Sequence, residues 1–200
     1  MAQSAKTRRL EFLFDFGSPA SYLAYKRVPA LAARTGAEVD YVPMLLGGVF
    51  KATGNASPAT VPAKGRWMNA DLRRWAERFG TEFNRNPFFP INTLHLMRGA
   101  TGMIGDPRFT AYCDAVFDGM WLSPKNLGEP AELIPVLERA GLSADEFRAL
   151  TERDDVKDRL KTTTERAVER GVFGAPTFFV GEEMFFGQDR MDFVEEALTA

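Results

Sequence analysis

The sequence feature that most constrains the fold is an apolar run that stops at Gly17 and restarts behind Ser18-Pro19. Leu10 to Phe16 is rich in aromatic residues, which suits a short strand buried on both faces of a sheet. Ser18 stands at the N-cap position of a following helix, and Pro19 loses no hydrogen bond in the first turn. The pattern predicts a strand, a sharp break and a helix.

The break at Ser18 is the first candidate site. It places a hydroxyl beside free backbone N–H groups at the positive end of a helix, a position that favours a thiolate, phosphate or carboxylate. The alternative is that Ser18 only caps the helix, since serine before proline is common at helix starts. The local sequence leaves both roles open.

A second strand should follow this helix. The helix is expected to run to about Thr35, with Gly36 just beyond its end. Glu38 to Pro43 alternates in polarity and predicts a strand. Strand, helix and strand in this short space predict a right-handed unit with two parallel strands.

The segment Met44 to Arg66 is rich in glycine and proline, and we expect it to be a long packed loop without regular structure. Lys51 and Asn55 are the polar residues of this loop that are best suited to face a ligand. A solvated lysine and an asparagine in a turn are the alternative interpretation.

The next hundred residues change to a helical period. The first helix is expected from Trp67 to a stop at Gly80, and Asp106 should cap another helix. The further helices are expected at Asn92–Ile104, Asp106–Trp121, Pro130–Arg139, after a capping box at Ser143, and at Asp155–Arg170.

The chain then returns to a strand pattern. Gly171 to Phe186 reads as a β-hairpin. The proline of Ala175-Pro176 directly precedes an aromatic strand, which favours a cis peptide bond that leaves the Ala175 backbone exposed at the end of the sheet. A trans proline on an edge strand is the alternative. Gln188 and Asp189 then open a closing helix, and helix capping alone would explain Asp189.

Composition excludes several classes of function. The chain of 200 residues has 45% hydrophobic residues, and its 25 basic and 27 acidic residues nearly cancel. No basic stripe indicates nucleic acid, no segment approaches a membrane span, and Met1 to Arg9 lacks the apolar core of a signal peptide, so a cytoplasmic location is expected. One cysteine, Cys113, and one histidine exclude an internal disulfide, a Cys-x-x-Cys pair and a His-rich metal site.

The order of these elements is that of a thioredoxin-like α/β fold, interrupted by an all-α insertion. We expect residues 1–61 and 171–200 to form the thioredoxin-like domain and residues 62–170 the helical insertion domain. The sequence resembles the family of kappa-class glutathione transferases and 2-hydroxychromene-2-carboxylate isomerases in four motifs, in the same order. These are Phe14-Asp15-Phe16-Gly17-Ser18-Pro19, Leu46-Gly47-Gly48-Val49-Phe50-Lys51 with Gly54-Asn55, Phe173-Gly174-Ala175-Pro176-Thr177, and Phe186-Gly187-Gln188-Asp189-Arg190.

The resemblance implies a role for each motif in binding glutathione. It implies that Ser18 hydrogen-bonds the glutathione sulfur and that the main chain of Ala175, before Pro176, pairs with the cysteinyl part. Gln188 and Asp189 would hold the γ-glutamyl end. Some relatives have serine where this chain has Gln188, which puts the side-chain contact of Gln188 in question. A backbone N–H at a helix start could hold the γ-glutamyl end regardless of the side chain.

The second motif supplies the contacts to the other substrate. By the same resemblance, Asn55 lies where glutathione and substrate meet, and Lys51 offers its charge to a substrate carboxylate. The family also implies a homodimer that acts on small aromatic or electrophilic molecules.

Three functions remain open at this stage. The first is a glutathione-dependent isomerase of aromatic degradation, in which Ser18 stabilises a thiolate that adds reversibly to an unsaturated carbonyl. The second is a kappa-class glutathione transferase or peroxidase. The third is a non-catalytic thioredoxin-fold binding module. Ser18, Lys51 and Asn55 favour an enzyme, because a pure scaffold needs none of them.

Overall fold

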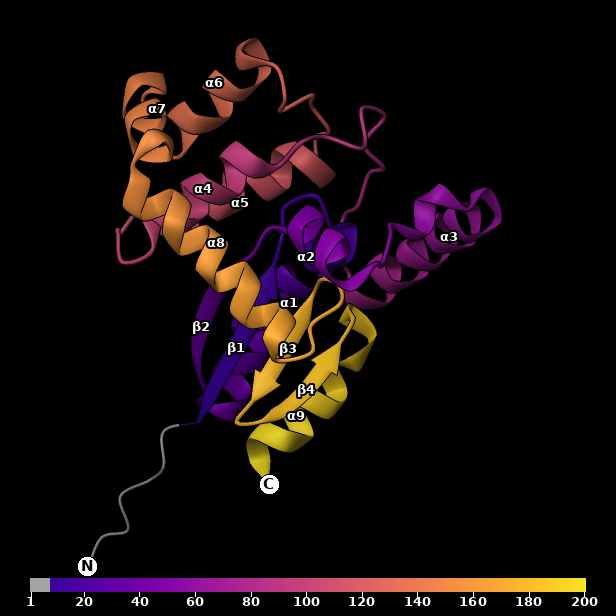
Figure 1. Cartoon of the computed structure of the whole chain (residues 1–200). Coiled ribbons are helices and arrows are strands. Elements are labelled where there is room, and N and C mark those ends of the chain that lie inside the picture. The colour runs from indigo at the N-terminus through magenta and orange to yellow at the C-terminus, as the bar shows by residue number, and fades with distance from the viewer. Residues whose placement is uncertain (1–7) are drawn as a thin grey trace, which may run out of the picture.

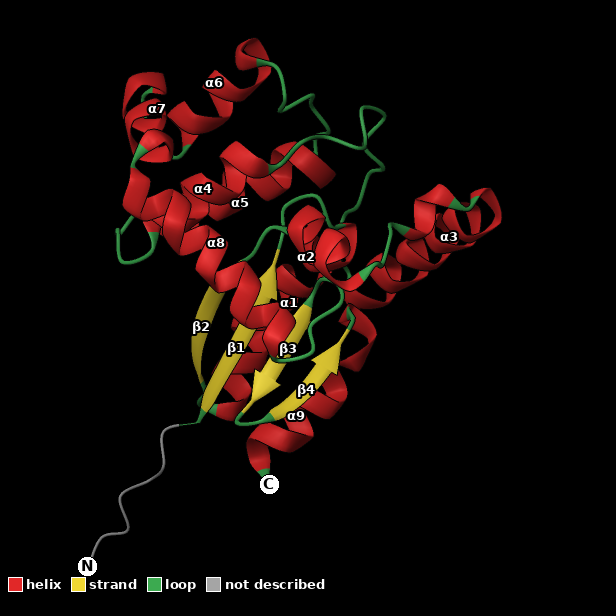
Figure 2. Ribbon diagram, viewed as in Figure 1, coloured by secondary structure: helices red, strands yellow, loops and turns green. Residues whose placement is uncertain are grey.

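A computed structural model describes residues 8–200, which form a four-stranded sheet surrounded by helices (Figure 1). The absence of a signal peptide was expected largely from residues 1–7, which lie outside the described residues. Strands β1 (Arg9–Phe14) and β2 (Glu38–Pro43) are parallel, as predicted. Strand β3 (Thr177–Val180) pairs antiparallel with β1, and β4 (Glu183–Phe186) completes the order β2-β1-β3-β4 (Figure 2).

The two faces of β1 bury different side chains because successive residues of a strand point to opposite faces. Phe12 and Phe14 are fully buried in the larger core, where the ring of Phe12 stacks on Phe178 with centroids 5.3 Å apart. Leu13 lies in a smaller cluster with Val49 on the other face. The predicted burial of this strand on both faces is therefore confirmed.

Helices cover both faces of the sheet. Helix α1 (Pro19–Thr35) and the last helix, α9 (Met191–Thr199), contribute to the larger core, and helix α8 (Asp154–Glu169) contributes to the smaller cluster. The remaining helices are α2 (Leu46–Thr53), η1 (Pro58–Thr60), α3 (Pro62–Phe79), α4 (Leu94–Met103), α5 (Phe109–Trp121), α6 (Pro130–Arg139), α7 (Ala144–Glu152) and η2 (Gln188–Arg190).

The larger core is continuous between the sheet and the inserted helices. Phe14 of β1 lies 5.7 Å from Phe117 of α5, measured between ring centroids, and both side chains are fully buried. The inserted helices α4 to α7 rise above the sheet in Figure 1, whereas α3 projects to one side. The domain boundaries at residues 61/62 and 170/171 stay a prediction.

The expectation of an irregular segment over Met44 to Arg66 is wrong. Residues Leu46–Thr53 form α2, and α3 begins at Pro62 rather than at Trp67. The glycines suggested a loop, but Gly48 lies where α2 packs closely on α8: a Cβ there would make a tight contact of 3.2 Å with the Thr164 side chain. A glycine inside a helix is tolerated where it lets two helices approach.

The predicted cap at Asp106 is also wrong. Helix α5 begins at Phe109, and Asp106 instead accepts a hydrogen bond of 2.8 Å from the Arg108 backbone in the preceding turn. The Arg108 guanidinium pairs with the same carboxylate at 3.0 Å, and this contact lowers the Asp106 pKa. The capping box at Ser143 is confirmed, since its hydroxyl and the Glu146 carboxylate make both expected bonds.

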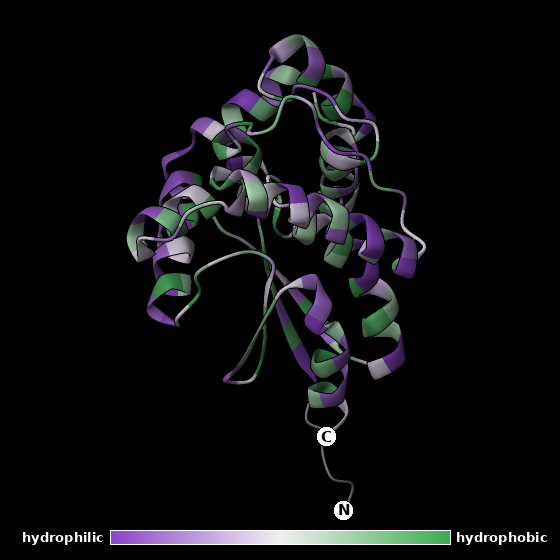
Figure 3. Cartoon of the chain, turned by 90° about the vertical axis from the view of Figure 1, so that its right-hand side faces the viewer, coloured by the Kyte–Doolittle hydropathy of each residue, from purple (hydrophilic) through white to green (hydrophobic). Residues whose placement is uncertain are grey.

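Hydropathy alternates around the helices, as Figure 3 shows by the mixture of both colours on them. One-sided burial of this kind is what packing a helix on a sheet or on another helix requires. Within residues 8–200, no helix combines the length and the apolar character that crossing a membrane would need.

Candidate functional site

The strongest candidate site is the turn between β1 and α1, where Ser18 faces the loop before β3. The Ser18 hydroxyl donates a hydrogen bond of 2.9 Å to the Ala175 carbonyl and accepts one of 3.1 Å from the Ser21 backbone. The Ala175-Pro176 peptide bond is cis, as predicted. Two segments separated by 157 residues in sequence therefore meet at one hydroxyl.

The N-cap interpretation of Ser18 is confirmed by the bond from Ser21, but it does not describe the whole environment. Ser18 is 5% exposed, and its single O–H group points to another loop rather than to its own helix. Pro19 has no N–H, and the Ala20 N–H has no hydrogen-bond partner within residues 8–200. The turn thus keeps a free donor at the positive end of α1.

Two more predicted residues converge on the loop from Phe173 to Pro176. The Asn55 side-chain amide donates to the Phe173 carbonyl at 2.9 Å. The Gly187 N–H donates to the Pro176 carbonyl at 3.0 Å, which places the start of η2 beside this loop. Ser18, Asn55 and the start of η2, with Gln188 and Asp189, therefore lie around one loop, and their role in binding stays a prediction.

Within η2, Gln188 and Asp189 differ in their surroundings. Gln188 is only 9% exposed, whereas the Asp189 side chain is about one-third exposed. The Asp189 carboxylate is paired with the guanidinium of its neighbour Arg190 at 2.7 Å. Asp189 therefore offers an accessible negative charge that a ligand cation would share with Arg190 or take from it.

Asp15, which was not among the predicted site residues, is the carboxylate that organises this turn. Asp15 is 1% exposed and accepts three hydrogen bonds of 2.8 Å, from the Gly17 N–H, the Leu46 N–H and the Thr93 hydroxyl. Burial raises its pKa, and the three bonds oppose that rise. One side chain thus ties the Ser18 turn to the start of α2 and the start of α4.

A signal for Asp15 was present in the sequence. A charged residue between Phe14 and Phe16 in a buried strand has to be partnered, because an unpaired buried carboxylate is costly. The identity of its partners was not predictable, because Leu46 and Thr93 are 31 and 78 residues away.

The inserted helices also hold the backbone of this turn. The indole N–H of Trp121 donates to the Phe16 carbonyl at 2.7 Å. The Phe16 N–H contacts the Met97 sulfur at 3.4 Å. The helical insertion therefore supports the end of β1 directly, and it does more than cover the sheet.

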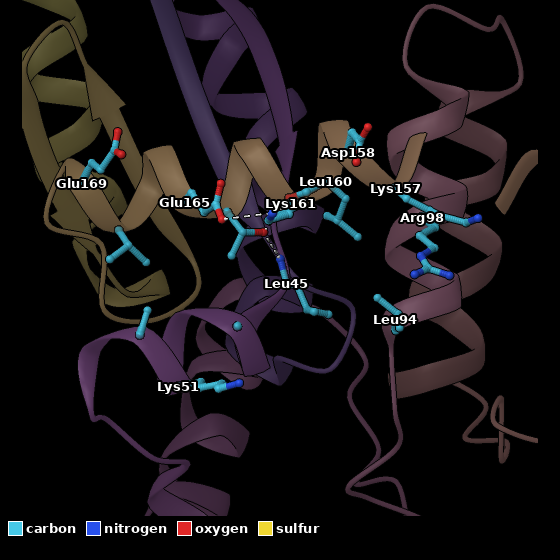
Figure 4. Close-up of a pocket in the computed structure, with 14 residues that line it drawn as sticks. Leu45, Lys51, Leu94, Arg98, Lys157, Asp158, Leu160, Lys161, Glu165 and Glu169 are labelled. Carbon is cyan, nitrogen blue, oxygen red and sulfur yellow. Dashed lines mark hydrogen bonds and ion pairs between the residues drawn. The ribbon is translucent and has the colours of Figure 1, made fainter. Parts of the chain in front are cut away.

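Lys51 differs from the other predicted site residues in the cavity that it lines. It lies in α2 and lines a cavity formed by α2, α4 and α8, whereas Ser18, Asn55 and Ala175 do not line that cavity (Figure 4). Gly54 ends α2 and turns the chain, and the Asn55 side chain that follows it reaches the Phe173 loop. The expectation that both residues serve one substrate remains a prediction.

The comparisons with known proteins identify the family. A family model described as a DsbA-like thioredoxin domain matches residues 9–199. A 2-hydroxychromene-2-carboxylate isomerase of Sphingobium xenophagum is 32% identical over 96% of this chain and 98% of that protein. A solved 2-hydroxychromene-2-carboxylate isomerase superposes with a TM-score of 0.85 at 30% identity, covering 95% of this chain and 94% of the other.

The chain belongs to the isomerase and kappa-class transferase family of DsbA-like thioredoxin proteins. Human glutathione S-transferase kappa 1 is 27% identical over 96% of this chain and 91% of its own. Pseudomonas aeruginosa DsbA shares the fold with a TM-score of 0.58 at 16% identity. The predicted family and fold are confirmed, and the relatives are enzymes.

Membership in the DsbA-like family does not bring a redox cysteine pair to this turn. A Cys-x-x-Cys pair would put one thiol three residues before the other, and here Ser18 and Ser21 have that spacing. The one cysteine, Cys113, is fully buried in α5, and burial raises its pKa well above the usual value. Disulfide exchange by the chain's own thiols is thus excluded at Ser18.

Proposed function

We propose that this protein is a glutathione-dependent isomerase that acts on 2-hydroxychromene-2-carboxylate or a similar intermediate of aromatic degradation. Its relatives at 32–33% identity carry the name of that isomerase. The observation that carries the glutathione part of the proposal is the pairing of Ser18 with Ala175 at the start of α1. The chain supplies a thiolate-stabilising turn there but no thiol.

The polar groups of the turn fit the tripeptide. The Ala175 N–H has no hydrogen-bond partner within residues 8–200, so a backbone-like ligand has a donor to pair with. Asp189 offers a carboxylate to an ammonium group, and the Ala20 N–H and the Ser18 hydroxyl are donors for an anion. Glutathione, when bound, would supply the nucleophilic sulfur that the turn lacks.

Ser18 would act as a donor to the thiolate and would not form a covalent bond. A serine hydroxyl has one proton, which in this structure is given to the Ala175 carbonyl. Donation to a sulfur requires rotation of the hydroxyl away from that carbonyl. The Ala175 carbonyl is then free to accept a hydrogen bond from an N–H of the ligand. The Ser18 hydroxyl and the Ala175 carbonyl thus both exchange their mutual hydrogen bond for one to glutathione. The free Ala20 N–H and the α1 dipole lower the thiol pKa further.

The remaining residues would orient the reactants. Asn55 holds the Phe173 carbonyl and so fixes the loop that carries Ala175. Lys51 would offer a positive charge to the substrate carboxylate from α2. Holding two reactants in one geometry removes much of the entropic cost of bringing them together.

A kappa-class glutathione transferase is the second candidate function. It is favoured by the relatives of that name at 24–27% identity, which span at least 92% of this chain. Both functions need the same thiolate at Ser18. They differ in the electrophile and in whether the sulfur leaves again, as in an isomerase, or stays bonded to the product, as in a transferase. In either case we expect a homodimer, as the family implies, and a cytoplasmic location, as the sequence predicts.

Glutathione binding is the direct test. A ligand that binds only the native state raises the melting temperature. Isothermal calorimetry and thermal unfolding should both detect glutathione at or below millimolar concentration, and S-methylglutathione, which cannot form a thiolate, should bind less tightly. No binding at millimolar concentration would refute the glutathione role and favour a binding module. Once binding is established, two assays separate the two candidate enzymes. Turnover of 2-hydroxychromene-2-carboxylate indicates the isomerase, and conjugation of glutathione to an electrophile indicates the transferase.

A further inference from the structure

A cavity lies between α2, α4 and α8, and Leu45 in its lining is followed by Leu46, whose N–H bonds Asp15 of the Ser18 turn. Its volume is about 710 Å3, within the range of small-molecule sites. Leu45, Leu94 and Leu160 give it apolar walls from the start of α2, from α4 and from α8. Figure 4 shows these three elements around the cavity, with α8 crossing between the other two. The shape and lining fit a ligand with an apolar body.

The charges around this cavity are unevenly placed. Four cations and three carboxylates line it: Lys51, Arg98, Lys157 and Lys161, with Asp158, Glu165 and Glu169. All three carboxylates are exposed, whereas Arg98 and Lys157 are half-buried. The acids therefore lie toward solvent and leave the inner part of the cavity positive.

Arg98 is the cation without a partner. Lys157 pairs with Asp154 at 3.0 Å, and Lys161 approaches Glu165 at 3.9 Å. Within residues 8–200 the Arg98 guanidinium makes no ion pair and no hydrogen bond, although it is half-buried and lines the cavity. Partly desolvating a guanidinium without an acceptor is unfavourable, and an anion in the cavity would remove that cost.

The chemistry of the cavity selects one kind of anion. A guanidinium presents parallel N–H donors that match the two oxygens of a carboxylate, and apolar walls exclude a small hydrated ion. We propose that this cavity binds an apolar carboxylic acid, with Arg98 as the bidentate partner of the carboxylate and Lys51 as the second cation. The inference rests on the proposed function only in taking this acid as the second substrate.

The test measures binding of 2-naphthoate without glutathione or turnover. Calorimetry should show that the wild type prefers 2-naphthoate over the neutral 2-naphthamide by about tenfold or more. Arg98→Met keeps the length of the side chain and should abolish this preference. Arg139→Met, at an exposed arginine of α6 outside the cavity, should keep it. Equal affinity of the wild type for both compounds would overturn the proposal, as would an unchanged preference in Arg98→Met.

A second variant keeps the test valid if Arg98→Met unfolds. Lys51→Met changes an exposed residue of α2 and should reduce the preference for naphthoate by about threefold or more, whereas an unchanged preference would count against the proposal. Saturating glutathione should leave the naphthoate affinity within about twofold, and full competition would place naphthoate in the tripeptide site and overturn the inference. Naphthoate binding without glutathione binding would refute the proposed function alone, and the reverse result would refute this inference alone.

Discussion

The Ser18 turn and the cavity between α2, α4 and α8 are neighbouring regions built in opposite ways. At the turn, Asp15 and Ser18 are almost fully buried, and their oxygens make short hydrogen bonds mainly to backbone groups. In the cavity, Lys51 is exposed, and the Arg98 side chain lacks a polar contact within residues 8–200. The turn is fixed before any ligand arrives, whereas the cavity offers charge that a ligand would complete.

This difference indicates what each region contributes to a reaction. A preorganised turn stabilises charge without reorganising when the reaction occurs, which suits the atom that must remain a thiolate. Exposed cations give selectivity and little stability to the free protein. Substitutions in the turn should therefore affect folding and glutathione together, and substitutions in the cavity should affect only the second ligand.

The largest effect on stability is expected at Asp15. Asp15→Asn should lower the free energy of unfolding by about 1–3 kcal/mol, because its amide NH2 must face at least one buried donor, whichever way it is turned. Thr93→Val removes one hydroxyl donor, keeps both backbone bonds and should cost about 1 kcal/mol. Urea denaturation measures both variants. If Asp15→Asn leaves the free energy of unfolding unchanged, this carboxylate does not organise the turn.

The next effect concerns Asp189 and the affinity for glutathione. Asp189→Ala should weaken glutathione binding by about tenfold, since a charged hydrogen bond to the γ-glutamyl ammonium is lost. The loss is not larger because Asp189 is already paired with Arg190 in the free protein, which reduces the net contribution of that bond to binding. Asp192→Ala, at an exposed carboxylate in the first turn of α9, is the matched control. Calorimetry should separate the two variants, and equal affinities would remove Asp189 from the site.

Asn55 and Lys51 test the comparison further, because Asn55 contacts the Phe173 loop whereas Lys51 lines the cavity. Asn55→Ala frees the Phe173 carbonyl and should weaken glutathione binding by about threefold to tenfold. Lys51→Met should leave glutathione binding unchanged and weaken the binding and turnover of an acidic second substrate. Titrations of both variants with glutathione test this assignment, which fails if Lys51→Met loses as much affinity as Asn55→Ala.

The smallest effect is expected at Cys113. Burial raises the pKa of this thiol well above its usual value, so the thiol stays protonated at neutral pH and is shielded from reagents. Ellman's reagent should find no reactive thiol in the native protein and one after unfolding. Rapid labelling of the native protein would show that the α5 core opens readily.

The turn was predictable from sequence because local chemistry determines it. Ser18-Pro19 marks a helix start in any fold, and Ala175-Pro176 before an aromatic strand marks the cis bond. The parallel pairing of the first two strands followed from the strand, helix and strand pattern. These features depend on residues that are adjacent in the sequence, so they can be predicted without knowing the tertiary contacts.

The cavity and the buried network were not predictable for the opposite reason. Arg98 matters because of α2 and α8, and Asp15 because of Leu46 and Thr93, which are distant in sequence. Helix α2 was missed because Gly47 and Gly48 are typical of loops, although Gly48 lies in the close contact between α2 and α8. Tertiary contacts override local propensity at such positions.

The most direct test of the account is the pKa of the glutathione thiol bound at Ser18. Ultraviolet thiolate absorbance of the complex against pH measures it, and the buried Cys113 thiol should add no thiolate background. A lost hydrogen bond to a charged group, worth about 1.5–3 kcal/mol, predicts that Ser18→Ala raises this pKa by about one to two, with turnover falling in parallel. Superimposable curves for the wild type and Ser18→Ala would contradict the catalytic role and leave Ser18 as a helix cap.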